Sequence, residues 1–172
     1  MDTQQNLVTA EALLQPYTVG AAAHAPGRVD AVIHPENLTA AVKALVDGRW
    51  GYLAAITGLD HPWPKTPKAA PKPGEAAASA APAGPVEDRL EALYQFVNGA
   101  AVATLRVSVP YHDPRLPSIC PLIPSATLYE RELIEMFGFV IEDTPDPARL
   151  LLPDDWPDGV YPLRKAFEGL GA

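Results

Sequence analysis

The hydrophobic pattern of the first half of the chain predicts a strand, a helix and a second strand. Apolar and polar side chains alternate over residues 28–34, which is typical of a half-buried strand. Apolar positions recur every three or four residues over 35–47, and Pro35 suits a first helical turn. The nearly continuous apolar run of 51–57 indicates a strand buried on both faces. These elements have the size of a crossover unit, so both strands can lie in one sheet.

The second half predicts a β-hairpin and a short edge strand. Apolar and polar positions alternate over residues 90–97 and 104–109, and Asn98-Gly99 between them is a strong hairpin signal. Residues 119–123 are expected to form another strand. Pro121 confines this strand to the edge of a sheet, because proline has no backbone N–H to donate.

A change of composition divides the predicted domain into two parts. Residues 61–85 contain 7 prolines and 8 alanines, a composition too poor in large apolar side chains to form a core. We interpret them as a flexible, partly polyproline linker, with a basic tether for a partner as the alternative. The remaining segments, 28–60 and 86–138, predict one α/β (α+β) domain with a mixed sheet of about four strands and two main helices. An N-terminal extension, 1–27, precedes it and shows a weak helical repeat at Leu7, Ala10 and Leu14.

Residues 127–138 predict a short helix with defined ends. Thr127 and Glu130 match a capping box, and Gly138 stands where a helix ends. One face of the helix is apolar, and the other is charged. The charged residues either form a solvated face or face a basic partner. They do not converge on one point, so catalysis by them is not expected; they are Glu130, Arg131, Glu132 and Glu135.

Residues 139–172 are apolar yet rich in proline, which excludes a long helix. Ordering a residue costs about 1–2 kcal/mol, and burying a large apolar side chain returns roughly 1.5–3 kcal/mol. Because only about a third of these residues are large and apolar, the segment does not cover its own ordering cost. We predict an extended arm, which either packs partly on the domain or is held by a partner surface. Its expected anchors are Trp156, Tyr161 and Leu163.

Composition and charge exclude several classes of function. A net charge of −8 argues against a nucleic-acid-binding surface. The single cysteine, Cys120, excludes a disulfide framework and is interpreted as a small core residue. No apolar run is long enough to cross a bilayer, so a cytoplasmic chain is expected. A cation held by Asp154, Asp155 and Asp158, as in a small metal-dependent hydrolase, is the enzymatic alternative, although an acidic loop is usually just solvated.

Two motifs resemble one known family. Residues 129–138 resemble the signature of the hydrophilic C subunit (the thirty-kilodalton type) of respiratory complex I, the NADH:quinone oxidoreductase, and residues 161–165 resemble its closing motif. The likeness extends over residues 28–60 and 86–168. It implies a subunit without a redox centre, whose domain and arm pack on the large hydrogenase-like subunit. Iron–sulfur clusters, quinone and any flavin or nickel–iron centre would belong to partner subunits.

The resemblance also implies a partner interface and a location. Glu130, Arg131 and Glu132 would pair with charged groups on the large subunit or across the subunit's own sheet. The chain would lie at the cytoplasmic face of the membrane and contact the membrane only through the complex. The full set of predicted interface residues is Glu130, Arg131, Glu132, Glu135, Trp156, Tyr161, Pro162, Leu163, Arg164 and Lys165.

Two segments depart from the complex I pattern. Residues 143–146 read Asp-Thr-Pro-Asp, where complex I proteins typically have Gly-His-Pro-Asp. Residues 150–157 are more similar to the homologous subunit of group 4 membrane-bound [NiFe] hydrogenases and related complexes such as formate hydrogenlyase. The sequence therefore does not identify the electron donor or acceptor. A generic scaffold unrelated to electron transfer is a third alternative.

Overall fold

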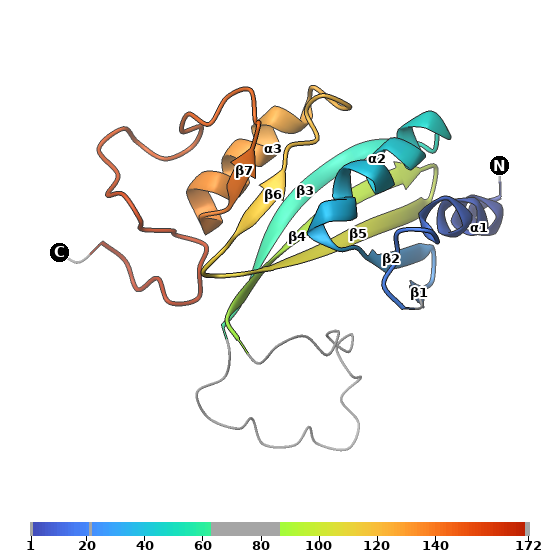
Figure 1. Cartoon of the computed structure of the whole chain (residues 1–172), viewed down its shortest axis with the longest axis horizontal. Coiled ribbons are helices and arrows are strands. Elements are labelled where there is room, and N and C mark those ends of the chain that lie inside the picture. The colour runs from blue at the N-terminus through green and yellow to red at the C-terminus, as the bar shows by residue number, and fades with distance from the viewer. Residues whose placement is uncertain (1, 21, 63–86, 171–172) are drawn as a thin grey trace, which may run out of the picture.

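The computed structural model describes residues 2–20, 22–62 and 87–170. Its centre is a five-stranded mixed sheet in the order β1-β2-β5-β4-β3 (Figure 1). β2 and β5 run parallel to each other, and the other neighbouring strands are antiparallel. The strands are β1 (Ala23–Ala25), β2 (Arg28–Val32), β3 (Tyr52–His61), β4 (Arg89–Asn98) and β5 (Ala101–Pro110).

Helices pack on one face of this sheet. Their buried side chains form a single hydrophobic cluster with alternate residues of the strands. The π-helical turn η2 continues α3 directly. The predicted α/β (α+β) fold class is confirmed, and α1 and the short β1 are added to it. The helical elements are α1 (Thr3–Leu14), η1 (Pro35–Asn37), α2 (Leu38–Asp47), α3 (Ala126–Glu132) and η2 (Leu133–Phe137).

β2 and β3 share the sheet as expected, but they are not neighbours. The hairpin of β4 and β5 lies between them, which makes β3 an edge strand. The expectation that 51–57 is buried on both faces is therefore wrong, and Tyr52 is 66 % exposed. One small residue of β3, Gly58, makes room for the helix above the sheet. A Cβ atom on Gly58 would stand 2.5 Å from the ring of Phe137, so glycine lets η2 approach the sheet closely.

The predicted hairpin is present as β4 and β5. Its two turn residues are Gly99 and Ala100, because Asn98 pairs with Ala101 across the ladder. Gly99 has a φ angle of 61°, as the first residue of a type II′ turn requires. The turn thus lies one residue later than the Asn98-Gly99 pair predicts.

The predicted strand at 119–123 is wrong, because these residues form a turn and loop. A short two-stranded parallel sheet is formed instead by β6 (Arg115–Pro117) and β7 (Val140–Glu142). The amide of Ile119 donates to the carboxylate of Glu130 at 2.8 Å. A backbone group bonded to a side chain in this way does not join a ladder.

The N-terminal segment packs on the domain. The helical repeat predicted from Leu7, Ala10 and Leu14 is confirmed, since all three are buried in α1. The indole N–H of Trp50 donates to the carbonyl oxygen of Asn6 at 2.8 Å, which ties α1 to the connection between α2 and β3.

The signature helix, α3 with η2, agrees only in part with the capping prediction. Gly138 ends the helix in the left-handed region with a φ angle of 77°, as predicted. The capping box is wrong, because α3 begins at Ala126 and Thr127 lies inside it. The predicted linker, 61–85, falls outside the described residues except at its first two positions.

Candidate partner interface

Glu130, the first glutamate of the signature helix, is buried inside the chain. Its exposed fraction is 1 %. Its carboxylate accepts hydrogen bonds from the hydroxyl of Ser118 at 2.9 Å and the amide of Ile119 at 2.8 Å. Neither alternative drawn from the sequence, a solvated face or a basic partner, describes this residue. Glu130 instead fixes the loop between β6 and α3, because its carboxylate replaces the water that these donors would otherwise bind.

Two neighbours of Glu130 stay protonated. Burial raises the pKa of Tyr94, and the nearby charge of Glu130 adds to the effect. Burial also raises the pKa of the Cys120 thiol; its hydrogen bond to Glu130 adds to this shift, and one from Ser118 opposes it. A protonated thiol is a poor nucleophile and metal ligand. Cys120 is therefore a small core residue, as predicted.

Glu135 holds the arm, residues 139–172, at its centre. The carboxylate accepts three successive backbone amides, those of Leu150, Leu151 and Leu152, at 3.1, 2.9 and 3.1 Å. Successive N–H groups that converge in this way form a nest, which binds anions. Glu135 is 7 % exposed, so the amides of the arm take the place of its hydration water.

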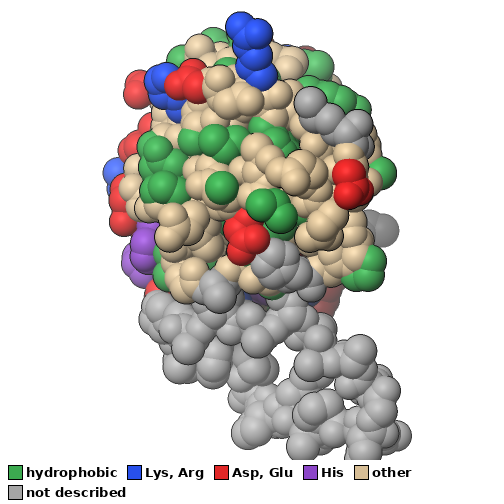
Figure 2. Space-filling model, turned by 90° about the vertical axis from the view of Figure 1, so that its right-hand side faces the viewer, with side chains coloured by type: hydrophobic (Ala, Val, Ile, Leu, Met, Phe, Trp, Pro, Cys, Tyr) green, Lys and Arg blue, Asp and Glu red, His purple; other side chains and the backbone are tan. Residues whose placement is uncertain are grey.

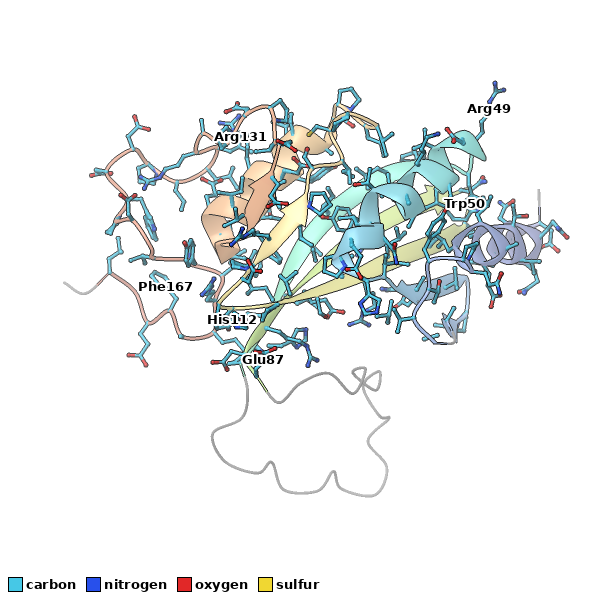
Figure 3. All side chains as sticks on the ribbon, in the orientation of Figure 1. Arg49, Trp50, Glu87, His112, Arg131 and Phe167 are labelled. Atoms are coloured by element: carbon cyan, nitrogen blue, oxygen red, sulfur yellow. The ribbon has the colours of Figure 1, made fainter. Side chains whose placement is uncertain are left out.

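Arg131, four residues before Glu135, holds the preceding stretch of the arm. Its Nε atom donates to the carbonyl oxygen of Ala148 at 2.7 Å, and the guanidinium also donates to the carbonyl oxygen of Arg149. The same group pairs with Asp146 at 3.2 Å. Figure 3 shows Arg131 on the side of α3 that faces the arm. The i,i+4 pair with Glu135 that the spacing allows is replaced by these contacts.

The closing motif makes a second attachment, at the end of the helix. The amide of Leu163 donates to the carbonyl oxygen of Met136 at 3.1 Å. The Nε atom of Arg164 donates to the carbonyl oxygen of Phe137 at 2.6 Å. Carbonyls in the last turn of a helix lack partners within it, and a cation there is favoured by the helix dipole. The arm thus completes the C-terminal end of the helix.

Aromatic rings and one carboxylate complete this second attachment. The guanidinium of Arg164 lies 4.5 Å from the centre of the Tyr161 ring and 4.7 Å from that of Tyr111. Asp60, at the end of β3, accepts the hydroxyl of Tyr111 and the amide of Lys165, the latter at 2.7 Å. Burial raises the pKa of Tyr111, and its hydrogen bond to Asp60 adds to that shift.

Side chains of the arm also make contacts within the arm itself. Arg149 donates to the carbonyl oxygens of Pro153 and Asp154 and pairs with Asp158 at 2.8 Å. The rings of Trp156 and Phe167 pack 6.0 Å apart. In the parts of the chain that the structure describes, no group of three His, Cys, Asp or Glu side chains is placed to hold a metal ion.

Several large apolar side chains of the arm are exposed, among them three leucines. Leu150 is 38 % exposed, Leu151 61 % and Leu163 51 %. Lys165 is also exposed. Glu132 is partly exposed, and its side chain forms no hydrogen bond or ion pair within the described residues. Pro162 is half-buried. The other predicted interface residues make contacts inside the chain: Glu130, Arg131, Glu135, Trp156, Tyr161 and Arg164.

Sequence reasoning missed several residues of these attachments. Asp60 bonds to Lys165, which is 105 residues away in the chain, and to Tyr111, 51 residues away. Ser118 and Asp146 were also missed. A polar residue at the end of an apolar strand, as Asp60 is, offers the one available signal, and it does not indicate a partner.

A separate polar network lies on the other face of the sheet. Arg106 donates to both carboxylate oxygens of Glu91, at 2.7 and 2.9 Å, and His61 contacts the same carboxylate at 2.8 Å. Burial acts to raise the pKa of Glu91, but Arg106 and then His61 outweigh it, so the pKa lies below its usual 4.5. Because Arg106 and His61 bind the buried Glu91 carboxylate, we interpret this network as a stabilising element of the fold.

Figure 2 shows the end of the molecule opposite the arm. Its hydrophobic side chains are separated by polar and charged ones and form no continuous patch. A hollow at this end is lined by Val46, Trp50, Tyr52 and Ile123, among others. The arm, at the other end of Figure 1, is therefore the better candidate for a partner surface.

The family model described as "Respiratory-chain NADH dehydrogenase, 30 Kd subunit" matches residues 31–172. This chain belongs to that family. The resemblance predicted from the two motifs is thereby confirmed. The matched range includes the whole signature helix and the arm of this complex I-family chain. Within its described residues, no helix is both long and apolar enough to span a membrane.

Relatives of this complex I-family chain come from two kinds of complex. It is 50 % identical over 62 residues to formate hydrogenlyase subunit 5 of Escherichia coli, which covers 36 % of this chain and 11 % of the relative. It is 44 % identical over 63 residues to the NADH-quinone oxidoreductase C subunit of a Nocardioides species, covering 37 % and 24 %. The beta subunit of the membrane-bound hydrogenase of Pyrococcus furiosus is 44 % identical over 64 residues, covering 37 % of each. The chain thus spans only a minor part of each relative.

Two solved structures share the fold. A trypsin-resistant fragment of Nqo5 has a TM-score of 0.57 and 26 % identity, and the match covers 85 % of this chain and 99 % of that one. A chain of the membrane-bound sulfane sulfur reductase, an archaeal respiratory membrane complex, has a TM-score of 0.66 over 98 % and 88 % of the two chains. Its 19 % identity supports the fold alone.

Proposed function

We propose that this chain is a non-catalytic hydrophilic subunit of a membrane-attached, complex I-like NADH/quinone oxidoreductase. It packs on the large hydrogenase-like subunit, beside iron–sulfur subunits of the peripheral electron-transfer arm of the complex. The observation that carries this proposal is that the arm is ordered on the domain but leaves apolar side chains uncovered. The backbone of that segment is held at two places, yet Leu150, Leu151 and Leu163 remain exposed. A contiguous group of exposed apolar side chains marks a protein contact site, and Leu150 and Leu151 are adjacent in the chain.

In this proposal the chain supplies a surface and no redox chemistry. Its one cysteine is buried with a raised pKa, and its described residues contain no cluster fit to hold a metal ion. Iron–sulfur clusters, quinone and any flavin or nickel–iron centre then belong to the partner subunits. The chain lies peripherally at the cytoplasmic face of the membrane and contacts the bilayer only through the complex. Carbonate washing of membranes tests this location, because it releases peripheral proteins.

The second candidate is the equivalent subunit of a group 4 membrane-bound [NiFe] hydrogenase or formate hydrogenlyase. It is favoured by the 50 % identity to formate hydrogenlyase subunit 5. The aligned residues make up 11 % of that relative, so the corresponding sequence there is part of a much longer polypeptide.

Purification of the tagged chain from source-cell membranes tests both candidates. We expect one large hydrogenase-like subunit to co-purify in about equal amount. Stoichiometric nickel, with nickel-ligating cysteines in that subunit, would identify a hydrogenase. Quinone reduction without nickel would identify the complex I type. Recovery of the tagged chain without any large subunit would contradict the proposal in either form.

A stand-alone metal-dependent hydrolase remains the enzymatic alternative. It would use Asp154, Asp155 and Asp158. The guanidinium of Arg149, however, already pairs with Asp158 and donates to the carbonyl oxygen of Asp154. Elemental analysis of the purified chain separates the two classes. A subunit of the proposed kind carries no stoichiometric metal, whereas the hydrolase requires it.

A further inference from the structure

The signature helix holds the arm by its backbone. Glu135 accepts three arm amides, and Arg131 donates to two arm carbonyl oxygens. None of these bonds involves a side chain of residues 148–152. The chain path is therefore fixed while the side chains of Leu150 and Leu151 stay available for another contact.

Backbone order and side-chain exposure coincide at the leucines held by Glu135. Leu151 donates the shortest of the three amide bonds, at 2.9 Å, and its side chain is 61 % exposed. Leu150, beside it, is 38 % exposed. An exposed leucine on a mobile segment loses conformational freedom when it binds, whereas one on a fixed segment has already lost it. This arrangement presents the leucines in a preformed position.

The residues that follow define the character of the partner. Asp154 and Asp155 follow the leucines after Pro153, and both are exposed. Within the described residues neither carboxylate forms an ion pair, whereas that of Asp158 is paired with Arg149. The chain as a whole carries a net charge of −8. A partner that takes this loop needs an apolar pocket with Lys or Arg at its rim.

We infer that Glu135 and Arg131 preform residues 146–155 as a docking loop, which inserts Leu150 and Leu151 into an apolar, basic-rimmed pocket on the large subunit. This inference rests on the proposed function and adds to it the contact and the residues that position it. Glu135 and Arg131 are positioning residues here, because they act on the partner only through the arm. Leu150 and Leu151 are the contact residues, and Leu151 is the more exposed of the two.

The test distinguishes the positioning of the loop by Glu135 from the contact that Leu151 makes with the partner. Tagged Glu135→Gln and Leu151→Ser variants replace the native chain in the source cell, and the large subunit recovered per tagged chain is measured. Hydrogen–deuterium exchange on each purified chain reports the amides of residues 150–152. Glu142→Gln and Leu128→Ser are matched controls, since both residues are exposed and lie outside the loop.

Glu135→Gln should speed exchange at the three amides and lower recovery of the large subunit at least about fivefold, because charge-assisted bonds to the nest are lost. Leu151→Ser should lower recovery to a similar extent while the amides keep their protection. Recovery that also falls as salt is raised supports the basic rim. Both controls should match the unaltered chain.

The failure of this inference is distinguishable from failure of the proposed function. Unchanged recovery with Leu151→Ser overturns the docking loop. Slow exchange in Glu135→Gln overturns its positioning by that residue. If the large subunit is lost only when the whole arm is removed, the proposed function stands and this contact is wrong. If it is retained even then, the role of the arm in the proposed function is wrong as well.

Discussion

Replacing Gly138 with alanine should disturb the end of the signature helix and the arm together. Gly138 has a φ angle of 77°, in the left-handed region that side chains rarely adopt. A Cβ atom built on it would stand 2.4 Å from Cζ and 2.5 Å from Cε2 of the Tyr161 ring. The ring therefore rests directly on the glycine. Alanine needs both a strained backbone and a displaced Tyr161.

The expected magnitude follows from these two effects. An alanine in the left-handed region costs about 1–2 kcal/mol. Displacing Tyr161 also removes its ring from Arg164, 4.5 Å away, a contact worth about 0.5–1 kcal/mol at an exposed site. Gly138→Ala should lower the free energy of unfolding by about 1.5–3 kcal/mol. It should also release the second attachment of the arm.

Urea denaturation measures the stability, and hydrogen–deuterium exchange measures the attachment at the amides of Leu163 and Lys165. Gly99→Ala is the control, because Gly99 also has a positive φ angle, 61°, but a Cβ atom there meets nothing within 4 Å. It should cost about 1–2 kcal/mol and leave the arm protected. Native protection of both amides in Gly138→Ala would show that the second attachment does not depend on Gly138.

Three further predictions concern the domain. Glu130→Gln should lower the free energy of unfolding by about 1–3 kcal/mol in urea denaturation, since an amide nitrogen then faces a donor, whereas Glu132→Gln should change it by less than about 0.5 kcal/mol. The pKa of Glu91 is lowered from 4.5, so its stabilising effect is present above that pH and is lost as pH falls through the native pKa. The loss of thermal stability in Glu91→Gln should thus be full at pH 7 and shrink below about pH 4.5; an equal loss at both would contradict the assigned network. Replacing residues 63–86 with a short glycine-containing turn should leave the circular dichroism spectrum native-like, because the flanking ends of β3 and β4 are paired; a collapsed spectrum would disprove it.

Local rules account for the features that the sequence predicts correctly. A left-handed glycine ends a helix wherever it occurs, so Gly138 was identified without knowledge of the fold. The buried stripe of α1, with Leu7 and Leu14, follows from helical periodicity in the same way. The hairpin follows from the alternation of apolar and polar residues. Its turn lies one residue later than predicted, because Asn98 pairs with Ala101 at the end of the ladder instead of entering the turn.

The fates of the three glutamates depend on distant segments. The three residues are chemically identical, but their surroundings differ. Glu130 is buried against the loop that contains Ile119, Glu132 is partly exposed, and Glu135 binds backbone amides of the arm. The partners of Glu135 lie 15 to 17 residues further along the chain. Periodicity determines which face of a helix a side chain occupies, but tertiary packing determines what covers that face.

The claim that the arm holds the large subunit is tested most directly by removing residues 144–172 of the arm. The deletion should begin after Asp143, because β7 pairs with β6 and its Ile141 is buried in the core. Tagged chains 1–143 and 1–172 are expressed in the source cell, and the large hydrogenase-like subunit that co-purifies is quantified. We expect chain 1–143 to stay folded by circular dichroism and to lose the large subunit. Equal recovery with both chains would contradict it.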